Sequence, residues 1–101
     1  MRTDEYEISM ELTAPRLSAP EKEDLLAHLV ELLTTEAAGT ALGPVGAIHG
    51  PVLELLYTVK AADTAELYDK LREVAIILRG SAGDFAATSA RRGGKRELAL
   101  A

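Results

Sequence analysis

The residues of this chain that could take part in acid–base or metal chemistry are few and scattered. His28 and His49 are the only imidazoles, and the chain has no cysteine. A transition-metal site would most naturally use one of these histidines. His28 has Asp24 and Glu31 nearby at helical spacing, which is typical of a solvated helix face, and His49 precedes a Gly-Pro turn. We therefore expect no catalytic residue, no bound metal and no cofactor.

The glycine-rich segment 39–51 does not match a phosphate-binding motif. The run Gly43–Gly46 lacks the third glycine of the dinucleotide fingerprint, and no lysine followed by a hydroxyl residue completes a P-loop. The run Gly80–Gly83 differs from the nucleophile elbow G-x-S-x-G, because its serine follows the glycine directly. The glycines therefore indicate turns and an irregular edge strand rather than a nucleotide site.

Three carboxylates, Glu5, Glu7 and Glu11, share one face of the first predicted strand. In a plait, Thr58 and Lys60 of a neighbouring strand would lie on the same face. General-acid or calcium chemistry would need more inward carboxylates and a pocket that raises their pKa. A solvated sheet face accounts for these residues better.

Two strands and two helices are clear from the periodicity. The first strand buries alternate residues, and the third buries another alternating set; these are Tyr6, Ile8, Met10 and Leu12, then Leu53, Leu55, Tyr57, Val59 and Ala61. A capping box at Ser18 and Glu21 opens a helix that runs to about Ala38. A second helix begins after Asp63 and ends near Gly80. Segment 39–51 supplies a short edge strand between the first helix and the third strand.

The order β-α-β-β-α predicts an α+β domain of the ferredoxin-like plait class, with both helices on one face of an antiparallel sheet. We expect residues 1–80 to form this single domain and residues 81–101 to form a basic C-terminal tail. The first strand is central in such a sheet and needs a second neighbour. Either the tail supplies it, through 85–90 or 97–101, or another chain does.

Composition supports a globular protein of one domain. The chain has 101 residues, of which 48% are hydrophobic and 27% charged, with net charge −5. Residues 1–80 carry 7 Lys/Arg against 14 Asp/Glu, whereas residues 81–101 carry 4 against 2. The acidic N-terminal segment does not resemble a secretory signal and no stretch reaches membrane length, so we expect a cytoplasmic protein without a membrane partner.

Hydrophobic residues also occur where the pattern favours polar ones. Val52 and Leu56 fall on the outward face of the third strand, and Ile76 lies nearly opposite the apolar stripe of the second helix. A partly apolar sheet face is typical of a surface that contacts another chain. We predict that the protein is a homo-oligomer that uses Val52 and Leu56, with Ile76 as a further contact.

The basic cluster of the tail comprises Arg91, Arg92, Lys95 and Arg96. No aromatic residues are interleaved with it, and the rest of the chain is acidic, so nucleic acid is a poor partner. A solubilising tail or the docking of a protein partner explains the cluster better.

These observations favour a non-enzymatic interaction module that self-associates through its sheet and docks a protein partner. One alternative is a regulatory sensor that binds a small molecule near the glycine-rich segment 39–50. Another is a cofactor-independent enzyme of the dimeric α+β barrel kind, although four aromatic residues in the whole chain disfavour an aromatic-lined cavity.

Overall fold

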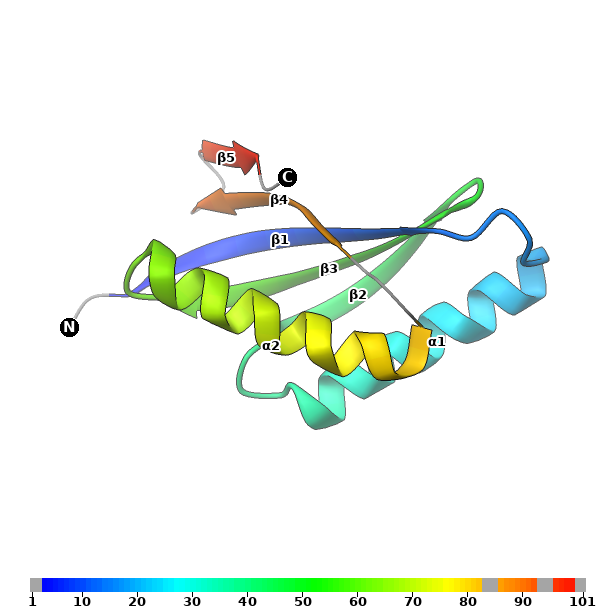
Figure 1. The fold of residues 1–101 in the computed structure, drawn as a ribbon, viewed down its shortest axis with the longest axis horizontal. Coiled ribbons are helices and arrows are strands. Elements are labelled where there is room, and N and C mark those ends of the chain that lie inside the picture. Colours follow the sequence, from blue (N-terminus) through cyan, green and yellow to red (C-terminus); the bar gives the residue numbers. More distant parts are fainter. Residues whose placement is uncertain (1–2, 83–85, 93–95, 100–101) are drawn as a thin grey trace.

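The computed structural model describes residues 3–82, 86–92 and 96–99. Its elements, in chain order, are β1 (Asp4–Thr13), α1 (Ala19–Glu36), β2 (Leu42–His49), β3 (Val52–Ala61), α2 (Thr64–Ala82), β4 (Ala86–Arg92) and β5 (Arg96–Ala99). The strands form one antiparallel sheet in the order β2-β3-β1-β4-β5, and both helices lie on the same side of it (Figure 1). The fold is therefore α+β, and the predicted ferredoxin-like plait is confirmed.

The tail supplies the second neighbour of β1. Strand β4 pairs with β1 along Tyr6–Glu11, with a register shift between Ser9 and Met10, and β5 then pairs with β4. Both tail segments named from the sequence thus contribute a strand, although each has shifted bounds. An amphipathic pattern was not needed here, because the free edge of β1 offers backbone hydrogen bonds to any segment that reaches it.

Helix α1 begins where the sequence predicted. The Ser18 hydroxyl accepts a hydrogen bond from the Glu21 amide at 3.3 Å, and the Glu21 carboxylate accepts one from the Ser18 amide at 3.0 Å. Both bonds satisfy amides that would otherwise have no partner in the first turn. They also hold the pKa of Glu21 below its ordinary value.

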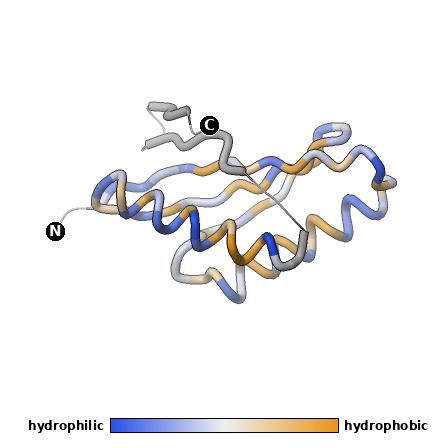
Figure 2. The backbone as a smooth tube through the Cα atoms, viewed as in Figure 1, coloured by the Kyte–Doolittle hydropathy of each residue, from blue (hydrophilic) through white to orange (hydrophobic). Residues whose placement is uncertain are grey.

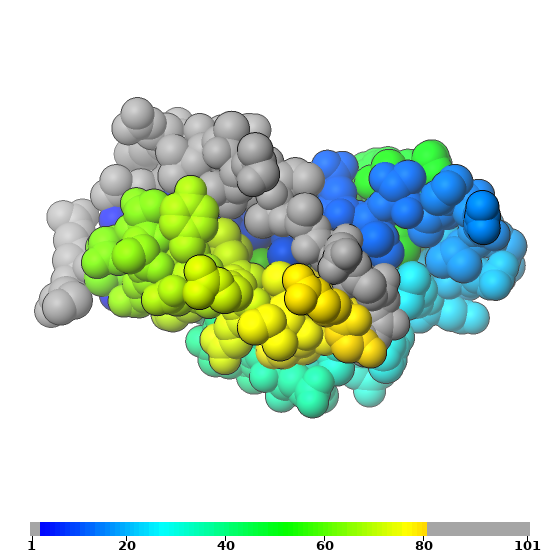
Figure 3. Space-filling view, in the orientation of Figure 1, coloured from blue at the N-terminus to red at the C-terminus, as the bar shows by residue number. Residues whose placement is uncertain are grey.

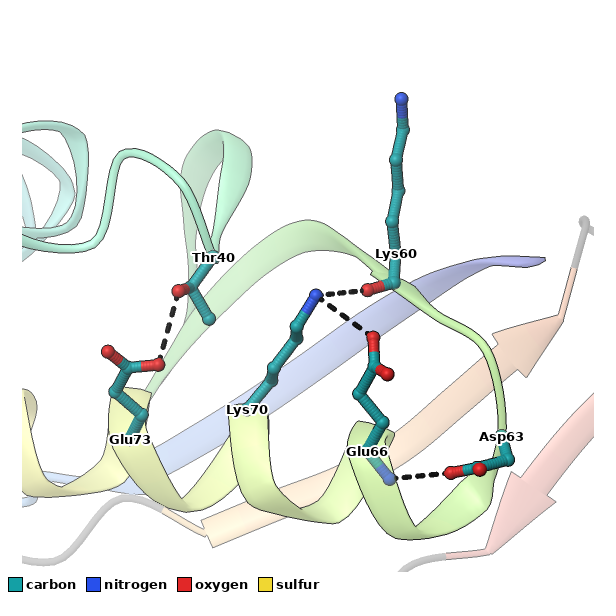
Figure 4. A network of polar contacts seen from close by, with 6 residues as sticks. All are labelled: Thr40, Lys60, Asp63, Glu66, Lys70 and Glu73. Atoms are coloured by element: carbon teal, nitrogen blue, oxygen red, sulfur yellow. Dashed lines mark hydrogen bonds and ion pairs between the residues drawn. The ribbon is translucent and has the colours of Figure 1, made fainter. Parts of the chain in front are cut away.

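Helix α2 is fixed to the end of β3 by the polar contacts drawn in Figure 4. The Asp63 carboxylate accepts from the Glu66 amide at 2.8 Å, as the capping pattern predicted. The Lys70 ammonium donates to the Lys60 carbonyl at 2.6 Å and forms an ion pair with Glu66 at 3.4 Å. The helix continues through Gly80 to Ala82, because glycine only weakens a helix by about 1 kcal/mol and does not forbid it.

The hydrophobic core lies between the helices and the sheet. Its largest fully buried residues are Ile8, Met10, Leu29, Leu33, Leu53, Leu55, Val59, Leu67, Val74 and Leu78. Helix α2 lies across the left and middle of the face seen in Figure 3, and its hydrophobic run lies in its C-terminal half (Figure 2). The alternation predicted for β1 and β3 is confirmed: the residues predicted to face inward, which begin with Tyr6 on β1 and end with Ala61 on β3, pack in or against the core.

Two further contacts involve side chains of the core. The Tyr57 hydroxyl donates to the Met10 sulfur at 3.0 Å, and burial raises the pKa of Tyr57, so the phenol stays neutral. Gly46 lies against Leu26: a Cβ at position 46 would be 2.5 Å from Cγ of Leu26. The missing side chain therefore lets α1 approach β2 closely.

Candidate functional site

The sheet face opposite the helices, here called the open face, collects most of the residues singled out from the sequence. Because side chains alternate along a strand, the neighbours of the buried Leu53, Leu55 and Tyr57 of β3 point to this face. They are Val52, Glu54, Leu56 and Thr58, all half-buried. From β1 the open face receives the exposed Glu5, Glu7 and Glu11 together with the buried Ser9.

A polar trio crosses the open face from β1 to β2. The Ser9 hydroxyl donates to Oε2 of Glu54 at 2.6 Å. Oε1 of the same carboxylate lies 3.0 Å from Nε2 of His49, at the end of β2. The hydrogen bond from Ser9, with a smaller effect of His49, holds the pKa of Glu54 below its ordinary value despite partial burial. Near neutral pH Glu54 is thus ionised and accepts at both oxygens, so Nε2 of His49 carries the proton.

The arrangement of the trio does not activate a nucleophile. In a catalytic triad the imidazole lies between the carboxylate and the hydroxyl and removes the hydroxyl proton. Here the carboxylate lies between the two. It accepts a hydrogen bond from the serine hydroxyl, but a carboxylate is too weak a base to remove the hydroxyl proton. These hydrogen bonds connect β1, β3 and β2 across the open face. Chemically, the trio offers a fixed negative charge on a half-buried surface.

Apolar residues lie on both sides of Glu54 on the open face: Val52 and Leu56 precede and follow it on β3, and Val45 lies on β2. Val45, Val52 and Leu56 are together called the apolar strip. Val45 of β2 is opposite Leu56 of β3 in register and is 55% exposed. Around Val45 and Leu56 the surface forms a hollow of about 210 Å³, which Glu7, Gly43 and Thr58 also line. The strip occupies the β2–β3 half of the open face, and the glutamates of β1 flank it.

The structure brings only some of the predicted contact residues together. Val52 and Leu56 share the open face, as predicted, but Ile76 lies on α2, on the helix side of the sheet, where it is 61% exposed. A single flat interface cannot include all three.

The basic residues belong to the other half of the sheet. Arg91 and Arg92 lie in β4, where Arg91 is opposite Glu7 of β1, and Arg96 lies in β5 opposite Arg92. Lys95 lies outside the described residues. Strands β3 and β1 separate this cluster from β2. The predicted roles of Ile76 and of the basic cluster stay predictions.

The sequence analysis missed Ser9 and Glu54 and left His49 without a partner. A signal for the pair of His49 and Glu54 was present in the sequence. Gly50 and Pro51 form a two-residue turn, so His49 is opposite Val52 and two residues along the strand from Ala47, which is opposite Glu54. Residues in such diagonal positions are within reach of long side chains. Ser9 could not be found this way, because it comes from a strand 45 residues away from Glu54.

Segment 39–50, suggested as a ligand site in the sensor alternative, forms strand β2 with its preceding turn. Gly46 serves the packing of Leu26, and Gly43 and Gly50 adopt left-handed conformations with φ of 58° and 59°. Among the described residues, no cluster of three or more His, Asp or Glu side chains could hold a metal ion. Neither helix in the described part of the chain is long and apolar enough to cross a membrane.

Comparisons with known proteins extend to the fold alone. No protein-family model matches the chain, and none of the curated proteins matches it. A de novo designed protein, Foldit4, superposes with a TM-score of 0.51 at 10% identity, covering 94% of this chain and all of the other. An uncharacterized protein, TM1266 from Thermotoga maritima, aligns over 99% of this chain and all of its own, with a TM-score of 0.46 and 16% identity. The design supports the plait architecture and carries no information about function.

Proposed function

We propose that this protein is a non-enzymatic interaction module that self-associates by packing the open face of its sheet against that of a second copy. The observation that carries the proposal is the apolar strip of Val45, Val52 and Leu56 on the sheet face opposite α1 and α2, which no helix of the described residues covers. In protein interfaces an apolar centre surrounded by charged residues is the common arrangement. Here the strip, with the hydrogen-bonded Glu54 between Val52 and Leu56, would form the centre, and Glu5, Glu7 and Lys60 would form the rim.

The polar trio is compatible with burial in such an interface. A carboxylate that loses water is strongly destabilised unless hydrogen bonds replace it. Both oxygens of Glu54 already have partners within the protein, Ser9 and His49. Covering the trio would therefore leave no new unsatisfied charge.

The dimensions of the face predict the strength of association. Strands β1 and β3 have 10 residues each and β2 has 8. At about 3.3 Å per residue and 4.8 Å between strands, three strands offer a surface of about 33 by 14 Å, or about 460 Å². Two such faces bury less than the roughly 1,200–2,000 Å² of a stable interface. We therefore expect a weak dimer that dissociates on dilution.

Light scattering over a range of protein concentrations tests the proposal. The wild-type chain should move from the monomer mass toward twice that mass as concentration rises. Leu56→Glu places a charge directly opposite Val45 in the strip and should remain monomeric with an unchanged circular dichroism spectrum. Ile76→Glu is the matched control, because it adds the same charge to an exposed residue on the helix side. It should dimerise like the wild type.

Three results would contradict the proposal. A wild-type chain that stays monomeric at every concentration removes self-association. A Leu56→Glu chain that still dimerises moves the interface away from the open face. Loss of the dimer in Ile76→Glu alone would place the interface on the helix side.

A further inference from the structure

A second surface lies between helix α1 and strand β2, on the other side of the sheet from the apolar strip. It is a groove of about 440 Å³. Its apolar lining, here called the floor, comprises Leu26, Ala27 and Val30 of α1 and Gly46 and Ile48 of β2. Ile48 is 37% exposed, and Val30 is half-buried. The groove is therefore apolar at its floor and accessible along its length.

One wall of the groove is an edge strand. β2 is the first strand in the sheet order, so one side of its backbone has no strand beside it among the described residues. In a hairpin closed by a two-residue turn, His49 and Val52 form a hydrogen-bonded pair and the pair type alternates from there. The backbone amides and carbonyls of Gly46 and Ile48 consequently point away from β3. These are the groups that an added strand would bind.

The helix side of the groove is acidic. Glu23 and Glu31 of α1 line it, and both are exposed. They are eight residues apart on α1, which is about 12 Å at 1.5 Å per residue. An extended peptide covers about the same distance in four residues. Residues i and i+4 of that peptide lie on one side of it, with residue i+2 between them above the apolar floor.

We propose that this groove binds an extended basic peptide, which adds a strand to the edge of β2. Its lysine or arginine side chains at positions i and i+4 pair with Glu23 and Glu31, and an apolar side chain at i+2 contacts Val30 and Ile48. A second copy of this chain is a poorer occupant, because two-fold pairing of β2 edges brings the glutamates of both copies together. This surface is separate from the open face, so the inference does not depend on self-association.

A synthetic peptide tests the inference. The probe is a fluorophore-labelled Thr-Lys-Thr-Ile-Thr-Lys-Thr with blocked ends, titrated with the full chain while fluorescence anisotropy is recorded. We expect saturable binding that the double variant Glu23→Lys/Glu31→Lys weakens about tenfold, as two exposed ion pairs would. The control is Asp24→Lys/Glu36→Lys, which changes the net charge equally on exposed residues of the same helix outside the groove. It should bind within about twofold of wild type.

Two further measurements separate strand addition from simple charge attraction. The peptide can be N-methylated at its odd-numbered or at its even-numbered amides. One of these two methylated peptides should not bind and the other should bind like the unmodified peptide, because only one set of amides faces β2. Amide shifts in nuclear magnetic resonance spectra should be largest at Gly46, Ile48 and the facing turns of α1. Absence of saturation, equal weakening by both charge variants, equal binding of both methylated peptides, or shifts centred on the open face would each overturn the inference.

Discussion

The close approach of α1 to β2 at Gly46 leads to a sharp prediction about stability. A Cβ at position 46 would lie 2.5, 2.7 and 2.9 Å from Cγ, Cδ2 and Cδ1 of Leu26. Separations under 3.0 Å are essentially never observed for real Cβ atoms. Leu26 is only 8% exposed and belongs to the core, so it cannot swing freely into solvent. Gly46→Ala should therefore push the helix away from the sheet or force Leu26 into a poorer rotamer.

The expected free-energy change follows from two opposing effects. Overpacking a core position destabilises a protein by about 1–3 kcal/mol. Replacing glycine by alanine within a strand returns about 0.5–1 kcal/mol, because the unfolded chain has less freedom to lose. Gly46→Ala should thus lower the free energy of unfolding by about 1–2 kcal/mol. For a chain of this size each kcal/mol corresponds to a fall in Tm of about 4–8 °C.

Urea denaturation followed by circular dichroism measures this change. Gly39→Ala is the control, since a Cβ at position 39 would meet no atom within 4 Å and the φ of Gly39 is not left-handed. Its stability should equal or slightly exceed that of the wild type. Leu26→Ala alone should cost about 2–5 kcal/mol by opening a cavity. The double variant Gly46→Ala/Leu26→Ala no longer has the clash. Its loss of unfolding free energy should therefore be smaller, by at least about 1 kcal/mol, than the sum of the losses measured for the two single variants.

The reasoning is refuted if Gly46→Ala is as stable as the wild type while Gly39→Ala behaves as expected. Strict additivity in the double variant would be equally damaging. It would mean that any loss in Gly46→Ala arises elsewhere than at Leu26.

Two further predictions concern the hydrogen bonds of Ser9 and Ser18. Ser9→Ala should lower the free energy of unfolding near neutral pH by about 1–2 kcal/mol, by removing a donor from an ionised carboxylate. The folded-state pKa of Glu54 is depressed, so its stabilising contribution is present above the ordinary value of 4.5 and is lost as pH falls through the lower folded value. The difference between Ser9→Ala and wild type should shrink over that acid range, and a constant difference down to about pH 2 would contradict this assignment. Ser18→Ala should cost about 1 kcal/mol in thermal unfolding, whereas Ser18→Asp should keep most of the stability; equal losses in both would show that the cap contributes nothing.

The sequence predicted those helices and strands whose own residues specify both the element and the face that it buries. In β1 and β3 the alternation of apolar and polar residues assigned the inward face correctly, and the capping residues Ser18 and Asp63 placed both helix starts. Strand β4 could not be assigned with the same clarity. Its segment has little alternation, and the free edge of β1 specifies its pairing from outside the segment.

The candidate surfaces also include features that a single segment predicts and features that depend on the packing of distant segments. Val52 and Leu56 could be assigned to an outward face from strand parity alone. The trio depends on the sheet order only through Ser9: His49 and Glu54 belong to one hairpin, whereas β1, which carries Ser9, lies beside β3 in the sheet although β2 and a helix separate the two strands in the chain. The groove between α1 and β2 depends on how closely a helix approaches a sheet edge. That distance is set by Gly46, which the sequence indicated only as part of an irregular edge strand.

The position of β1 between β3 and β4 also affects the protein while it is being made. More than seventy residues separate the end of β1 from the start of β4. At about 5–20 residues per second, a ribosome needs about 4–15 seconds to synthesise that interval. During this time one edge of the ten-residue strand β1 has no neighbour and can pair with nascent chains on nearby ribosomes. The protein is consequently most exposed to aggregation during translation, before β4 has emerged.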